Sequence, residues 1–264
     1  MNRVLNLFTP NKTIPKKDIV FMVAGQIVML VFLWHYLSTP LLPKPMEILG
    51  AWKDLVVSGG LLNEMYISTK LCFHALFISI ITCAILAYST VLPFFKPAGF
   101  MMRMMRFLPM IGLSFVFTLM TSSGYSLKVS LLVFGMSVFI LESMLAVVHS
   151  VTDVEYNHAR TIHGGNEWKV VWERVIRGKA HEMLFAVKQN FAISWTMLTF
   201  AEGLVRADGG VGTMLLNENK HFQLASLFAV QFSLFILGIG IDYLFGVLRN
   251  LLFPYADLLN TSKR

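Results

Sequence analysis

Six long apolar runs constrain the fold of this chain more than any other feature. They cover approximately residues 19–37, 65–95, 107–121, 127–148, 184–204 and 224–251. An α-helix crosses the hydrocarbon core of a bilayer, about 30 Å thick, with roughly 20 consecutive apolar residues. The third run is the shortest and reaches this length only if the Met-rich segment before it is also inserted. The sequence therefore predicts an all-α membrane protein with about six transmembrane helices.

The composition favours a surface that is largely covered by lipid. Hydrophobic residues make up 56% of the chain and charged residues only 14%, whereas an average soluble domain carries roughly 25% charged residues. The net charge is +7, but the Lys and Arg residues lie between the apolar runs. Membrane topology therefore explains the positive charge better than nucleic-acid binding, and no nucleic-acid partner is expected.

The distribution of Lys and Arg predicts that both termini are cytoplasmic. With the N-terminus inside, 16 of these residues fall in cytoplasmic segments and 6 in outer segments. Cytoplasmic segments of membrane proteins carry such an excess, and an even number of spans returns the C-terminus to the same side. No small-residue cleavage site follows the first run, so this run is expected to remain as a helix.

The chain is predicted to form one membrane domain with one large cytoplasmic segment. Residues 1–18 are expected to be a cytoplasmic N-terminal segment, residues 19–251 a single transmembrane domain, and residues 252–264 a cytoplasmic tail. The largest cytoplasmic segment is polar, has a helical pattern and is too short to fold as a separate domain. We call residues 150–183 the elbow and expect another protein to bind there.

No pattern in the sequence predicts an enzyme or a metal site. Residues 178–180 read Gly-Lys-Ala and lack the remainder of a Walker phosphate-binding loop, and residues 181–185 do not complete a zinc-protease HExxH. Residues 238–242, Gly-Ile-Gly-Ile-Asp, exceed the GxGD of intramembrane aspartyl proteases by one residue. No second aspartate lies in a span to share a proton. No catalytic, cofactor-binding or metal-binding residue is expected.

Two carboxylates inside apolar runs are candidate polar sites within the membrane. Glu142 lies in the fourth run and Asp242 in the sixth. Ionisable groups are costly in a bilayer, so each is expected to pair with another group or to contact a solute. His74, in the second run, is expected to be hydrogen-bonded, because a single histidine in a helical bundle usually is.

The elbow contains a motif that resembles a known transporter family. Residues 155–165 read Glu-Tyr-Asn-His-Ala-Arg-Thr-Ile-His-Gly-Gly and are similar to the EAA loop of binding-protein-dependent ABC importer permeases. Three further elements resemble the sulfonate, nitrate and taurine branch of that family. They are Leu-Leu-Pro-Lys-Pro at 41–45, Ala-Glu at 201–202 followed by Gly-Val-Gly at 210–212, and the spaced residues Gly238, Asp242 and Arg249. The Leu-Pro that follows the EAA helix in the family is Arg-Gly at 177–178 here.

The resemblance implies a function, partners and a location. The chain would be the permease subunit of an ATP-driven importer for a small solute, with an oxyanion such as nitrate, sulfonate, taurine or bicarbonate as a candidate. Its partners would be two copies of an ATP-binding subunit that holds ATP and Mg²⁺, an external solute-binding protein that is periplasmic or lipid-anchored, and a second permease copy. The location would be the bacterial cytoplasmic (inner) membrane, with several spans. The alternative is a membrane scaffold or assembly factor that does not transport.

The resemblance also assigns roles to residues at the two ends of the bundle. The ATPase-coupling residues would be Glu155, Ala159, Arg160 and the pair Gly164 and Gly165, of which either matches the glycine of the motif. A short helix over residues 155–168, ended or bent at Gly164-Gly165, would present the small side chain of Ala159 to a groove on the ATPase. At the outer gate, on the side of the binding protein, would lie Glu202, Gly210 and Gly212, where glycine permits a tight turn.

Overall fold

The computed structural model describes residues 15–37 and 42–254. All regular structure within these ranges is helical, and no strand occurs in them. The prediction of an all-α fold is therefore confirmed. The expectations for residues 1–14, for Leu41 of the Leu-Leu-Pro-Lys-Pro element and for residues 255–264 of the tail lie outside the described residues.

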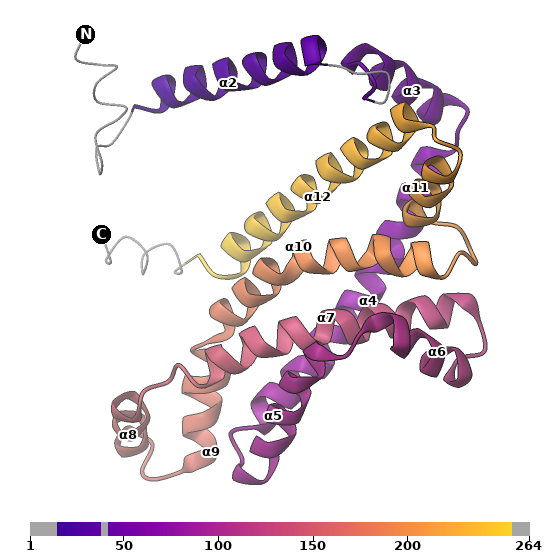
Figure 1. Ribbon diagram of the computed structural model, residues 1–264. Helices are drawn as coiled ribbons and strands as arrows, with labels where there is room; N and C mark the ends of the chain where they lie inside the picture. The colour runs from indigo at the N-terminus through magenta and orange to yellow at the C-terminus, as the bar shows by residue number, and fades with distance from the viewer. Residues whose placement is uncertain (1–14, 38–41, 255–264) are drawn as a thin grey trace.

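Each of the six apolar runs contains one helix (Figure 1). These helices are α2 (Lys16–Leu37), α4 (Leu61–Ser89), α6 (Met110–Met120), α7 (Gly124–Val148), α10 (Ala180–Leu204) and α12 (Leu224–Leu252). Shorter helices connect them, namely α3 (Pro45–Val57), α5 (Lys96–Met104), α8 (Asp153–Ile162), α9 (Glu167–Val170) and α11 (Val211–Lys220). Single 3-10 turns, Pro93–Phe95 and Met105–Phe107, flank α5, and a π-helical segment, Val171–Arg177, follows α9.

Four of the helices are long and apolar enough to cross a membrane, fewer than the six expected. They are α2, α4, α7 and α12. A fifth span is counted if the segment Pro93–Phe107 and α6 form one broken span, since they are bent by 113° to each other. On its own α6 has 11 residues and a length of only about 17 Å.

The remaining difference between the expected and the observed number of candidate spans arises from α10. This helix is long enough to cross a membrane but too polar to count as a candidate span. Its 25 residues include charged and amide side chains, which lower its hydropathy. These residues are tolerated because α10 packs against α4, α7, α11 and α12. The buried Asn190 amide, for example, donates hydrogen bonds to Ser143 Oγ at 2.7 Å and to the Ala186 carbonyl at 2.8 Å. Inside a bundle, such pairs replace the hydrogen bonds that lipid cannot provide.

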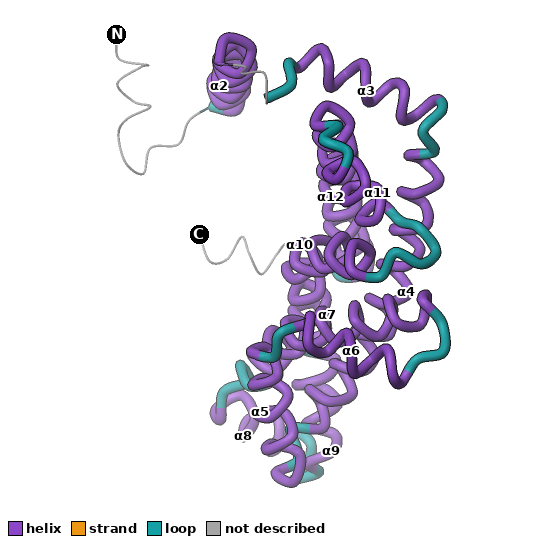
Figure 2. The backbone as a smooth tube through the Cα atoms, turned by 45° about the vertical axis from the view of Figure 1, so that its right-hand side comes forward, coloured by secondary structure: helices purple, strands orange, loops and turns teal. Residues whose placement is uncertain are grey.

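The hydrophobic core follows α7, against which α4 and α10 pack. In the apolar part of α7, 61% of the residues are buried, whereas none are buried in that of α2. Figures 1 and 2 show α2 apart from the bundle and joined to it through α3. Within the described residues it touches α12 through the Trp34 and Phe228 rings, whose centroids lie 6.2 Å apart.

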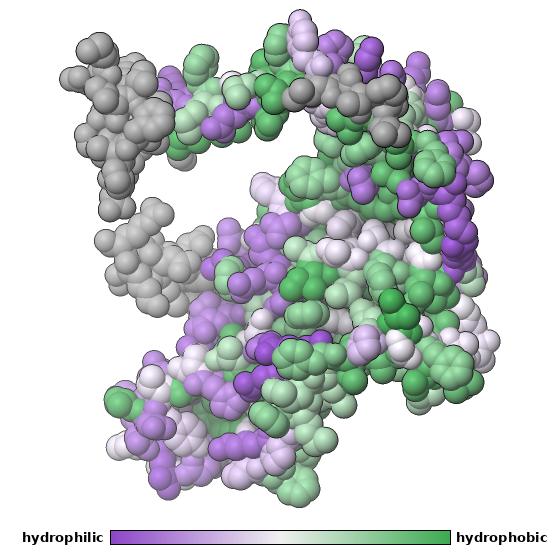
Figure 3. Space-filling model, viewed as in Figure 1, coloured by the Kyte–Doolittle hydropathy of each residue, from purple (hydrophilic) through white to green (hydrophobic). Residues whose placement is uncertain are grey.

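Large apolar side chains remain exposed on the surface of the bundle, as expected for helices that face lipid. On α6, for example, Phe115 is 69% exposed and Leu119 is 75% exposed. In Figure 3 apolar residues cover much of the central face, and hydrophilic residues gather at the lower left, where α8 and α9 lie. The surface of the bundle is therefore suited to contact with lipid, and the surface of the elbow to contact with water.

Candidate functional site

The turn between α10 and α11 has a backbone conformation that few residues other than glycine can adopt. Asp208, Gly209 and Gly210 all have positive φ angles, of 67°, 70° and 110°. Glycine adopts such angles at little cost because it has no Cβ. A Cβ on Gly210 would overlap the Glu202 carboxylate, and a Cβ on Gly212 would overlap the Thr199 carbonyl. The Gly-Val-Gly pattern at 210–212 therefore has a steric cause.

The Glu202 carboxylate lies against this turn and binds the start of α11. Glu202 is fully buried. Its Oε2 accepts a hydrogen bond from the Gly212 N–H at 2.9 Å, and its Oε1 accepts one from the Ser68 hydroxyl at 2.7 Å. Ser68 Oγ in turn accepts from the Val211 N–H at 2.8 Å. The unpaired N–H groups and partial positive charge of a helix N-terminus both favour a carboxylate there.

Two further charged side chains, from α4 and α7, bind the same turn. Glu64 Oε2 accepts a hydrogen bond from the Gly210 N–H at 2.5 Å. Lys128 is 1% exposed, and its Nζ donates to the Gly209 carbonyl at 2.7 Å. The buried ammonium also interacts electrostatically with the carboxylates of Glu202, Asp208 and Glu64. We call Glu64, Ser68, Lys128 and Glu202, together with residues 208–212, the α10–α11 lock.

The lock is suited to holding helices together rather than to binding a ligand. Both oxygens of Glu202 accept hydrogen bonds from the chain itself, and the side chain is fully buried, so its contacts are internal to the bundle. The structure brings together the three residues that the sequence assigned to the outer gate, Glu202, Gly210 and Gly212. The sequence interpretation missed the partners on other helices, although a lysine at the edge of an apolar run, Lys128, was a signal that could have been followed.

The two intramembrane carboxylates do not form a common site. Glu142 Oε2 lies 2.7 Å from Arg106 Nη1, and Asp242 Oδ2 lies 3.4 Å from Lys188 Nζ. Both acidic side chains are partly exposed, at 40% and 53%. Each carboxylate is therefore paired with a basic side chain of this chain and also remains partly exposed. His74 is also paired, because its Nδ1 lies 2.8 Å from the Tyr125 hydroxyl oxygen.

The elbow begins with a capped helix, α8, and then reverses at a double glycine. Thr152 Oγ1 accepts a hydrogen bond from the Glu155 N–H at 3.3 Å, and the Glu155 carboxylate accepts one from the Thr152 N–H at 3.3 Å. Gly164 and Gly165 both have positive φ, 61° and 79°, so both positions favour glycine. The expected helix over 155–168 is ended at this glycine pair, as the sequence predicted, because α8 ends at Ile162 and α9 begins only at Glu167.

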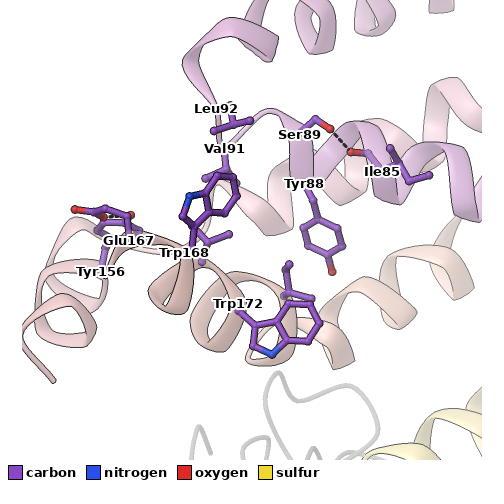
Figure 4. Close-up of a pocket in the computed structure, with 11 residues that line it drawn as sticks. Ile85, Tyr88, Ser89, Val91, Leu92, Tyr156, Glu167, Trp168 and Trp172 are labelled. Atoms are coloured by element: carbon purple, nitrogen blue, oxygen red, sulfur yellow. Dashed lines mark hydrogen bonds between the residues drawn. The ribbon is translucent and has the colours of Figure 1, made fainter. Parts of the chain in front are cut away.

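Glu167 joins α8 to α9 across this turn. Its Oε1 lies 2.8 Å from Arg160 Nε, and its Oε2 accepts a hydrogen bond from the Tyr156 hydroxyl at 2.5 Å (Figure 4). The hydrogen bond to the carboxylate raises the pKa of the Tyr156 phenol above its ordinary value. Arg160 is thus an internal ion-pair partner in the elbow. The sequence interpretation did not single out Glu167, whose role depends on the chain reversal.

Ala159 does not face a partner. It is 1% exposed, so its small side chain is required by packing inside this chain. The expectation that Ala159 lies on the contact surface of the elbow is therefore wrong. The large apolar side chains that the elbow exposes are instead Val154 at 79%, Ile162 at 62%, Trp168 at 70% and Trp172 at 55%.

A groove of about 460 Å³ separates the elbow from the end of α4. Tyr88 and Leu92 line it from the α4 side, and Trp168 and Trp172 line it from the elbow (Figure 4). Val175, in the π-helical segment, is buried in the core of the bundle. The elbow is therefore anchored to the bundle through this segment, which continues almost directly into α10.

Neither a protein-family model nor a curated protein matches the amino-acid sequence of this chain. Within the residues that the structure describes, no group of three His, Cys, Asp or Glu side chains is placed to hold a metal ion.

Proposed function

We propose that this chain is the membrane-spanning permease subunit of an ATP-driven importer. The resemblance of residues 155–165 to the EAA loop of ABC importer permeases supports this function, as do the apolar helices of the bundle. ATP and Mg²⁺ would bind to a separate subunit, since this sequence lacks a phosphate-binding loop. The location would be a bacterial inner membrane with both termini in the cytoplasm.

The observation that carries the proposal is the surface of the elbow. Val154, Ile162 and Trp168 expose apolar side chains on a segment that is otherwise polar. The ion pair and hydrogen bond of Glu167 hold α8 and α9 together, so these side chains are presented by a preorganised unit. An exposed apolar set on a rigid element is typical of a protein-binding surface. The ATP-binding subunit is the proposed occupant.

The helix α10 offers a route by which motion of the elbow would reach the far end of the bundle. It begins just after the π-helical segment of the elbow and ends next to Glu202 in the α10–α11 lock. Its 25 residues make a rod about 37 Å long. Closure of two ATPase subunits would move the elbows, and α10 would transmit that motion as a rigid body.

A complete transporter would contain two copies of this chain related by a two-fold axis. One chain supplies one elbow, whereas a pair of ATP-binding subunits offers two equivalent docking sites. The solute path would run between the copies, and a solute-binding protein would dock near α11. The resemblance to the sulfonate, nitrate and taurine branch makes a small oxyanion one candidate solute.

A substitution at Val154 tests the docking surface. Val154→Asp places a charge on the exposed apolar set, and burying that charge against a partner would weaken docking by tenfold or more. An acidic residue in the first turn of a helix interacts favourably with the helix dipole and stabilises the helix, so α8 should remain folded. The matched control is Val57→Asp at the end of α3, because Val57 is 77% exposed and Val154 is 79% exposed.

The measurement is the ATPase activity that co-purifies with the tagged full-length chain from its own membranes, normalised to the amount of permease. We expect activity with the unmodified chain and with Val57→Asp, and a loss of at least tenfold with Val154→Asp. Absence of any co-purifying ATPase, or equal recovery with both variants, would instead favour the non-transporting scaffold.

A further inference from the structure

A second groove, of about 560 Å³, lies between α10, α11 and α12 and shares Gly212 with the α10–α11 lock. Its polar lining comes from Thr196 and Thr199 of α10, Asn219 of α11 and Gln231 of α12. Phe200 adds an aromatic side chain that is 40% exposed, and leucines of α10, α11 and α12 form the rest of an apolar wall. None of the residues that line this groove is ionisable, which distinguishes it from the lock behind it.

The polar groups of this groove provide both hydrogen-bond donors and acceptors. Asn219 and Gln231 form no side-chain hydrogen bond with the part of the chain that the structure describes, so each offers two N–H donors and a carbonyl oxygen. The Thr196 hydroxyl donates to the Ala192 carbonyl at 3.0 Å, and the Thr199 hydroxyl donates to the Thr196 carbonyl at 2.9 Å. The threonine oxygens therefore remain available mainly as acceptors.

The amide of Gln231 favours contact of this part of the surface with a polar molecule. Gln231 is exposed within the apolar helix α12, next to Phe232, which is 55% exposed. An amide without a hydrogen-bond partner is unfavourable in hydrocarbon, where no water replaces the missing bonds. Water, a solute or a polar partner would satisfy it, and the groove is where such a molecule fits.

We propose that this groove is a binding site for a small uncharged solute with both donors and acceptors, such as an amide, a ureide or an amino-substituted heterocycle. Its role in transport rests on the permease function proposed above. A planar group would stack on Phe200, while Asn219 and Gln231 would exchange paired hydrogen bonds with it.

A free oxyanion matches the same groove poorly. An oxyanion only accepts hydrogen bonds, so the acceptor oxygens of Thr196 and Thr199 would oppose it. No cation lines the groove, and the Glu202 carboxylate lies directly behind Gly212, at 2.9 Å from its backbone nitrogen. The local field therefore disfavours a negative charge, in contrast to the oxyanion class implied by the sequence resemblance.

Saturation-transfer NMR on the purified full-length chain in detergent tests this assignment. The uncharged probes are uracil and N-methylurea, and the anionic probes are methanesulfonate and formate. We expect saturation transfer to at least one uncharged probe and none to the anions. Gln231→Leu and Thr196→Val should each weaken binding by about tenfold or more, because each removes a hydrogen-bonding group.

Gln189→Leu is the matched control, since Gln189 is an exposed amide on α10 that does not line the groove. It should bind the uncharged probes like the unmodified chain, and all variants should keep the same melting temperature. Transfer to methanesulfonate or formate, no transfer to any probe, or equal transfer with Gln231→Leu would each overturn the proposal. The co-purification of ATPase activity is a separate readout, so failure here would leave the permease proposal standing.

Discussion

At the scale of single residues, the buried carboxylate of Glu202 connects α10 to three other helices. It accepts hydrogen bonds from Ser68 on α4 and from the backbone of α11, and it lies near the buried Lys128 of α7. Helices α4, α7 and α11 thus meet at one side chain of α10. Removing one partner from a buried charged network leaves the others desolvated and unpaired, which costs far more than losing an exposed ion pair.

Glu202→Ala should therefore destabilise the protein strongly. We expect a loss of about 3–5 kcal/mol, because the Ser68 hydroxyl, the Gly212 N–H and the Lys128 ammonium all lose a buried acceptor or counter-charge. The measurement is thermal unfolding of the full-length chain in one detergent. Glu142→Ala is the control, since its exposed pair with Arg106 should contribute only about 0–1 kcal/mol. Similar shifts in melting temperature for the two variants would show that the α10–α11 lock is not a stabilising network.

At the scale of elements, α10 should be unable to insert into a membrane as an isolated segment. Lys188, Asn190 and Glu202 bind groups on neighbouring helices, and an isolated α10 would expose these side chains to lipid. A charged residue near the centre of a span costs about 2.5–3.5 kcal/mol during insertion. In an insertion reporter, Ala180–Leu204 should insert much less efficiently than Gly124–Val148, the segment of α7. Equal insertion would mean that α10 does not need the bundle.

The stability of the elbow should depend on the protonation state of Tyr156. The hydrogen bond to Glu167 raises the pKa of this phenol, so its contribution is complete below the ordinary phenol pKa and is lost as pH rises through the raised value. Glu167→Gln should lower the pKa of Tyr156 toward the ordinary value. Titration of ¹³C-labelled tyrosine, with Tyr156→Phe for assignment, measures this change. Glu173→Gln, which removes a nearby i,i+4 partner of Arg177, should leave the titration of Tyr156 unchanged.

At the scale of the whole molecule, the two exposed ends of the bundle should lie on opposite sides of the membrane. Lys169 on α9 and Lys220 at the end of α11 are both exposed. The excess of Lys and Arg in the predicted cytoplasmic segments places Lys169 inside and Lys220 outside. An impermeant thiol reagent applied to intact cells should therefore label Lys220→Cys and spare Lys169→Cys. The native Cys72 and Cys83 are buried at 1% and 2% exposure and should contribute little background. The opposite labelling pattern would invert the topology and remove the elbow from the cytoplasm.

The sequence by itself determined where the helices lie and where the chain turns. Each apolar run contains a helix whose ends differ from the run by a few residues, and the largest difference is at the end of the run 65–95, where α4 stops at Ser89. Hydropathy over such a window is a local property, so it can be read without knowledge of packing. The glycines at 164, 165, 209 and 210 are also local signals, because a positive φ excludes most side chains at that position whatever surrounds it. Gly212 is instead required by its close approach to the Thr199 carbonyl.

Tertiary structure decided which side chains meet and which are exposed. Ser68 and Glu202 are 134 positions apart, and Glu64 and Gly210 are 146 apart, so their contacts depend on how α4, α10 and α11 pack. The burial of Ala159 depends likewise on the fold of the elbow, and the polarity of α10 is tolerated only because other helices surround it. Periodicity along one helix reports which of its faces is apolar, but the partner of each polar side chain is set by a neighbouring helix whose position the local sequence does not encode.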